Sequence, residues 1–115
     1  MIPALLTQRY ELIQELDKAR ALRHALRAGG IEGQELQFIT ETIKNMEAEL
    51  SETEGEAQEL IDLLDDMQAR LFAALHYQAG YQWSEIAGIF GLTEDAAKAC
   101  VYRALRSVCG GDTTR

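Results

Sequence analysis

Histidine and cysteine, the side chains that most often carry catalytic or zinc chemistry, are few in this chain and far apart in its sequence. There are two of each: His24 and His76, Cys100 and Cys109. The cysteines form no CxxC pair, and no neighbouring group completes a metal tetrahedron, so reduced thiols are expected. No nucleophile and base are placed together, so a solvated or capping role is expected for both histidines. The pattern therefore predicts a protein that is not an enzyme and that uses neither a metal nor a cofactor.

Residues 80–98 have the spacing of a helix-turn-helix, in which two helices are joined by a short turn. Ala87 is small where the helices would cross, and Gly91, four residues later, suits the positive φ of the turn. The Thr93 hydroxyl can cap the second helix. Trp83 could stack on a nucleic acid, but a place in or beside the core is favoured. Three apolar residues are expected to fill the shared core: Ile86, Phe90 and Leu92.

This part of the chain, about residues 60–108, resembles region 4 of bacterial sigma factors. That family has a hydrophobic helix, a Gly-containing turn, an S/T-x-E-I-A helix, Gly-Leu, and a Ser/Thr-capped recognition helix that ends in a K-S-R-L-H-R-A-like stretch. The corresponding segments here are residues 71–77, Gly80, residues 83–87, Gly91-Leu92, Thr93 and residues 98–104. A short helical arm ahead of such a unit is similar to the small sigma-like regulators of phages and prophages. The resemblance implies a DNA-binding transcription regulator.

The resemblance also implies that residues 94–108 form a recognition helix in the major groove, with its N-terminal part at the base edges. Five residues would turn toward the core: Ala97, Val101, Ala104, Leu105 and Val108. The DNA-binding residues would be Thr93, Glu94, Asp95, Lys98, Ala99, Tyr102, Arg103 and Arg106. Of these, Lys98 and Tyr102 are expected to project outward at or near the bases. Arg103 and Arg106 are expected on phosphates.

Three features of the recognition helix depart from the family pattern. Glu94 and Asp95 occupy its first turn, where they suit the helix dipole but repel phosphate. Ala97 replaces a branched residue, and Cys100 stands where the family often has Arg. Because these changes weaken the expected DNA surface, a second function stays open. It is a protein-interaction module of the same fold that binds RNA polymerase or another protein without specific DNA binding.

Two helical segments precede this unit and must position it. Residues 3–28 have apolar side chains at helical spacing and are followed by Gly29-Gly30, which predicts one amphipathic helix. The next segment has an unbroken heptad seam of a and d positions. The seam consists of Leu36, Ile39, Ile43, Met46, Leu50, Thr53, Ala57, Leu60, Leu64, Met67, Leu71 and Ala74. Gly55 lies outside the seam, so one helix of about forty residues is favoured over two helices with a joint at residues 51–56.

We therefore predict an all-α protein with three parts. Residues 1–59 would form a helical hairpin or coiled-coil dimerisation arm, residues 60–109 the helix-turn-helix domain, and residues 110–115 a flexible tail. Two helices alone bury little apolar surface, so the seam is also expected to pack against a second subunit and to close a homodimer.

The charge of the chain is unevenly distributed. The formal net charge is −8, which argues against simple non-specific binding to nucleic acid. Residues 32–67 carry twelve acidic side chains and one basic one, Lys44. The favoured explanation of this acidic segment is a helix face exposed to solvent. The alternative is a surface that mimics DNA or binds a basic partner.

The expected location is the cytoplasm, because no apolar stretch could span a bilayer and the first residues lack a secretory pattern. The expected partners are double-stranded DNA and a second copy of the chain, with RNA polymerase as the partner in the alternative function. No membrane partner is expected.

Overall fold

The computed structural model describes residues 2–109, which form helices joined by short connections, with no strand among them. The elements in order are α1 (Ala4–Ala28), α2 (Gln34–Asp62), α3 (Met67–Ala73), a single π-helical turn η1 (Ala74–Gln78), α4 (Trp83–Phe90) and α5 (Glu94–Cys109). The prediction of an all-α protein is confirmed for this part of the chain. The tail expected at residues 110–115 lies outside the described residues.

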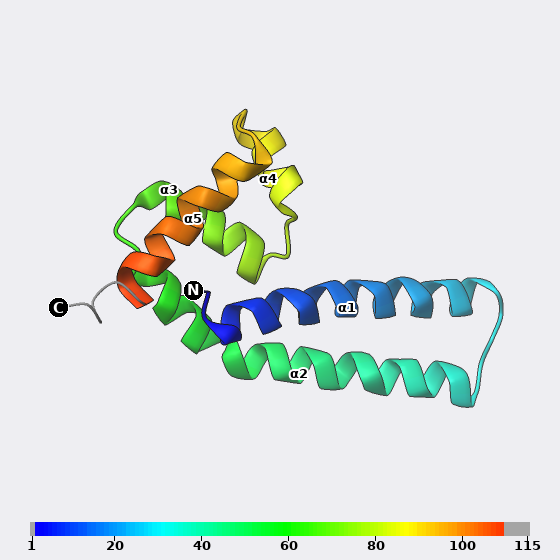
Figure 1. The fold of residues 1–115 in the computed structure, drawn as a ribbon. Coiled ribbons are helices and arrows are strands. Elements are labelled where there is room, and N and C mark those ends of the chain that lie inside the picture. The colour runs from blue at the N-terminus through cyan, green and yellow to red at the C-terminus, as the bar shows by residue number, and fades with distance from the viewer. Residues whose placement is uncertain (1, 110–115) are drawn as a thin grey trace.

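The molecule is elongated, with extents of 58 × 30 × 18 Å. At one end α1 and α2 lie side by side and run in opposite directions, and we call them the helix pair (Figure 1). At the other end α3, η1, α4 and α5 gather into what we call the C-terminal unit (Figure 1). The unit rests on the N-terminal half of α1 and the C-terminal end of α2, so the far tip of the helix pair projects away from it.

Helix α2 differs from both arrangements expected from the sequence. It passes through Gly55 without interruption, and it ends at Asp62 instead of continuing to residue 74. The side chain of Asp66 explains the break, because its carboxylate accepts a hydrogen bond of 2.8 Å from the Ala69 N–H and caps a new helix, α3. A local cap on the next helix thus ends α2, although the heptad pattern of the sequence continues past this point.

The heptad seam is covered by α1 of the same chain. Ile39 and Ile43 are buried against Leu16 and Ala19 of α1. Further along, Ala57 and Ile61 enter the larger core together with Leu6. The surface that we expected to be shared with a second subunit is therefore largely occupied within the monomer. The homodimer itself stays a prediction.

The larger core joins the helix pair to the C-terminal unit. Phe72 of α3 is fully buried at its centre, with Ile86 of α4 and Val101 of α5 around it. Leu64, in the connection between α2 and α3, is also buried in this core.

Candidate nucleic-acid interface

Local hydrogen bonds fix the turn between α4 and α5. Gly91 has φ of 69°, in the left-handed region that favours glycine, and the next residue, Leu92, donates its N–H to the carbonyl oxygen of Ala87 at 2.9 Å. The Thr93 hydroxyl oxygen accepts a hydrogen bond of 3.1 Å from the Ala96 N–H at the start of α5. The turn conformation expected of Gly91 and the capping role expected of Thr93 are both confirmed.

The core beneath this turn is smaller than the sequence predicted. Ile86 and Ala87 are buried, but Phe90 and Leu92 are 40% and 37% exposed, so the expectation that they fill the core is wrong. Phe90 is the last residue of α4, and its ring reaches only the edge of the core, with its centroid 5.0 Å from that of Phe72. Leu92 follows Gly91 in the short connection between α4 and α5.

Helix α5 presents one buried and one solvent-facing side. Ala97, Val101 and Leu105 are fully buried, as expected, at the four-residue spacing of one helical face. The other two expected core residues, Ala104 and Val108, are half-buried. Six of the eight residues expected to bind DNA have exposed side chains: Thr93, Glu94, Asp95, Ala99, Arg103 and Arg106.

The two residues expected to reach the bases are less free than predicted. Tyr102 is half-buried, and its ring packs edge-on against Trp83 with centroids 6.2 Å apart, so it does not simply project outward. Lys98 is also half-buried, and its charge acts on the buried His76. Trp83 itself is buried, which confirms its expected place in the core.

The charged side chains of α5 are divided along the helix axis. Glu94 and Asp95 lie in the first turn, whereas Arg106 lies in the last. Among the described residues the salt bridges join Arg9 to Glu54, Lys18 to Glu15 and Arg20 to Glu47, so none of them uses a side chain of α5. Within the part of the chain that the structure describes, Arg103 and Arg106 of α5 are exposed and lie outside these salt bridges.

A buried column of rings was not predicted from the sequence. His76 is 6% exposed, so the prediction of a solvated or capping side chain is wrong. Its imidazole lies between the rings of Tyr10 and Trp83, at centroid distances of 3.9 and 4.0 Å and nearly parallel to both. Burial lowers the pKa of His76 to about 4, although a hydrogen bond to Tyr81 opposes the shift. Nothing in the local sequence pairs His76 with Tyr10, which lies on the distant α1.

A buried arginine was also missed. Arg9 is almost fully buried between α1 and α2, where one Nη donates to the Leu50 carbonyl oxygen at 2.8 Å and to the Thr53 hydroxyl oxygen at 2.6 Å. The other Nη donates to a carboxylate oxygen of Glu54 at 2.7 Å. The second carboxylate oxygen of Glu54 accepts from Gln78 of η1 at 2.9 Å. This network attaches the helix pair to the C-terminal unit.

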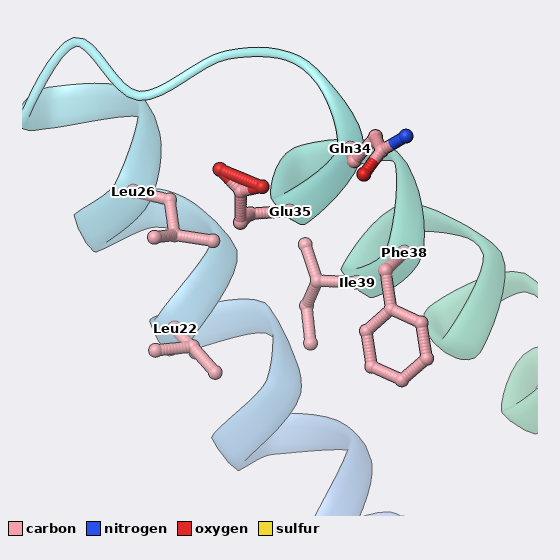
Figure 2. Close-up of a pocket in the computed structure, with 6 residues that line it drawn as sticks. All are labelled: Leu22, Leu26, Gln34, Glu35, Phe38 and Ile39. Atoms are coloured by element: carbon pink, nitrogen blue, oxygen red, sulfur yellow. The ribbon is translucent and has the colours of Figure 1, made fainter.

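An open apolar groove lies at the opposite end of the molecule, at the tip of the helix pair. Figure 2 shows its side chains, which come from the end of α1 and the start of α2. They are Leu22, Leu26, Gln34, Glu35, Phe38 and Ile39. Phe38 is 72% exposed, so this end of the helix pair leaves apolar surface in water.

The described residues hold no group of three or more His, Cys, Asp or Glu side chains that could bind a metal ion. None of the helices described is both long and apolar enough to cross a membrane. Cys100 lies with its Sγ 3.8 Å from a carboxylate oxygen of Asp66, and burial, together with this carboxylate, raises the pKa of the thiol. A raised pKa keeps the thiol protonated and poorly reactive.

Comparisons of the chain with protein-family models, with curated proteins and with solved structures found no match. Its function must therefore be argued from its own residues.

Proposed function

We propose that this protein is a DNA-binding transcription regulator in which α4 and α5 form a helix-turn-helix similar to that of sigma region 4. The observation that carries the proposal is the connection between the two helices. It combines a left-handed Gly91, a Thr93 cap and an α5 that buries one face and exposes the other. This is the arrangement that lets a second helix enter a major groove while the first helix supports it.

In this proposal the residues of α5 have different roles in DNA binding. Arg103 and Arg106 would pair with phosphates, since both are exposed and lie outside the observed salt bridges. The N-terminal turn would lie nearest the bases, where Asp95 could accept a hydrogen bond from cytosine. Tyr102 would act mainly by supporting Trp83, because its ring packs against that side chain.

Self-association belongs to the same proposal, because a second copy would double the few cationic contacts that one α5 provides. With the seam covered by α1 up to residue 61, the surface proposed for it is the uncovered continuation of the seam. Met67 and Leu71 lie there and are 75% and 45% exposed.

An alternative function is favoured by a specific observation. Glu94 and Asp95 are exposed at the first turn of α5, where a DNA-binding helix would meet phosphates or bases. Their charge would suit a protein partner with a basic surface, such as a subunit of RNA polymerase. In that case α4 and α5 would serve as a scaffold for protein binding.

The deciding experiment is the selection of genomic fragments by the purified protein at low salt, followed by anisotropy titrations of an enriched fragment. We expect Arg106→Ala to weaken binding to all sequences and to reduce the slope of log K against log salt by about one. Arg27→Ala is the matched control, since this arginine is exposed at the far end of α1. If no fragment is enriched, or if both variants bind alike, DNA binding by α5 is wrong, and the alternative is then tested by titration with purified RNA polymerase.

A further inference from the structure

Three stacked rings connect segments that are distant in sequence. Tyr10 comes from α1, His76 from η1 and Trp83 from α4, and the two ring pairs are inclined by only 14° and 16°. Tyr77 packs edge-on against His76 with centroids 4.7 Å apart, and Tyr102 of α5 packs edge-on against Trp83. His76 is therefore the middle of a column that runs from the helix pair to α5.

The chain is held closely around this column. Gln14 of α1 donates its side-chain N–H to the carbonyl oxygen of Gly80 at 2.9 Å. A Cβ on Gly80 would lie 2.5 Å from a methyl carbon of Ile13, so α1 rests directly on the connection between η1 and α4. His76 Nδ1 lies 2.7 Å from the carbonyl oxygen of Tyr81 in the same connection. Since a carbonyl only accepts, the neutral imidazole carries its proton on Nδ1.

We propose that His76 is a proton-sensitive joint: the neutral imidazole holds α1 against η1 and α4, and proton uptake at Nε2 loosens this contact. The reaction adds one proton from solvent and breaks no covalent bond. The resulting imidazolium would be a charge held between two rings with little access to water, which is costly to bury. Opening of the joint relieves that cost by returning the charged ring to solvent.

The groups around the joint support this direction. On α5 the nearby cation Lys98 disfavours a second positive charge, and burial of the ring disfavours it more strongly. Tyr10 and Tyr77 have raised pKa values and stay neutral throughout the acidic range. Two carboxylates of other elements lie near the groups around His76. The charge of Glu85 on α4 acts on Tyr10, and Glu54 of α2 accepts a hydrogen bond from Gln78. Neither is among the causes that shift the pKa of His76.

The pH range of the joint follows from the two states of His76. In the closed joint its pKa is about 4, and in the open joint it returns toward the ordinary value of 6.5. The closed state is therefore most stable above pH 6.5 and loses stability as the pH falls toward 4. By linkage, the equilibrium constant for opening should rise about 25-fold between about pH 7.5 and about pH 5.

The experiment uses the isotope-labelled full-length protein without DNA, so its outcome is independent of the proposed function. The imidazole of His76 is titrated by NMR, and its signals are assigned apart from those of the exposed His24, the only other histidine. Exchange of the Tyr81 amide, which donates to the Leu75 carbonyl oxygen at 2.9 Å, reports opening. His76→Phe keeps a flat ring in the column but binds no proton, so the ratio of wild-type to variant exchange rates cancels the intrinsic effect of pH.

We expect His76 to titrate well below the ordinary histidine pKa of 6.5 and the exchange ratio at Tyr81 to rise about 25-fold on acidification to about pH 5. The amide of Ile43, buried within the helix pair, should exchange more slowly than the Tyr81 amide throughout this pH range, which separates joint opening from global unfolding. A His76 imidazole that titrates near the ordinary pKa of 6.5, or an exchange ratio that stays flat, would overturn the proposal. If His76→Phe does not fold, the wild-type imidazole titration and the pH dependence of fluorescence from Trp83, the only tryptophan, decide the question alone.

Discussion

The contribution of a single side chain to the stability of this protein depends on its surroundings more than on its residue type. The side chains of Arg9 and Arg20 both project from α1, and each forms an ion pair with a glutamate of α2, at 2.7 and 2.8 Å respectively. The Arg9 side chain is 3% exposed, whereas that of Arg20 is 48% exposed. Water can replace the partner of Arg20, but it has little access to Arg9, whose Nε is already buried without a partner.

The two ion pairs give a matched prediction. Glu54→Ala should lower the free energy of unfolding by about 2 kcal/mol, because it leaves a buried guanidinium less well compensated. Glu47→Ala should lower it by less than about 0.5 kcal/mol, because it removes an exposed pair. Urea denaturation at neutral pH measures both values. Equal effects of the two substitutions would show that Arg9 has access to water in solution.

At the level of the elements, the ends of the helices are set by short-range hydrogen bonds. Asp66 caps α3, Thr93 caps α5 and Gly91 ends α4 in the left-handed conformation. Gly55, in contrast, lies inside α2 with open space around its Cα. The same residue type thus serves as a stop in one helix and is only a weak helix former in another.

Two glycine substitutions test this difference. Gly55→Ala should raise the free energy of unfolding by about 0.5 to 1 kcal/mol, because alanine favours the helix and meets no neighbour. Gly91→Ala should lower it by about 1 kcal/mol, because alanine is strained at positive φ. Thermal unfolding followed by circular dichroism compares the two. A loss of stability in Gly55→Ala would contradict the continuous α2.

At the scale of the whole molecule, the contact between the helix pair and the C-terminal unit decides which surfaces remain for partners. Pairing of α1 with α2 covers most of the heptad seam. Besides those on and next to α4, exposed apolar side chains lie at the tip of the helix pair and on or just before α3. Phe38 marks the first place and Met67 and Leu71 the second. Any second copy must bind where α1 does not.

Sedimentation velocity at micromolar concentration tests the proposed self-association. We expect a dimer for the wild-type protein and a folded monomer for Leu71→Asp, because this exposed side chain continues the seam beyond the reach of α1. Ile43→Asp is the contrasting variant: it should unfold the chain, since it buries an unpaired charge between α1 and α2. A monomeric wild-type protein, or a Leu71→Asp variant that still dimerises, would contradict this surface.

The short-range features were predictable because neighbouring residues determine them. The sequence alone located the helix at residues 3–28 to within one residue, the turn at Gly91, the cap at Thr93 and the buried face of α5 through Ala97, Val101 and Leu105. A hydrophobic period, a glycine at a turn and a hydroxyl before a helix each act within a few residues. Such local signals specify the same structure regardless of how the rest of the chain folds.

Only the tertiary structure decided the features that need distant partners. The burial of His76 and of Arg9 could not be predicted from the sequence, because the groups that bury them, Tyr10 for the first and Leu50 with Glu54 for the second, lie on other helices. The seam had the pattern of an intermolecular coiled coil, since a heptad repeat requires an apolar partner but does not specify which one. The fold supplies α1 of the same chain, because a loop of five residues keeps it next to α2 at a far higher effective concentration than a second molecule could reach.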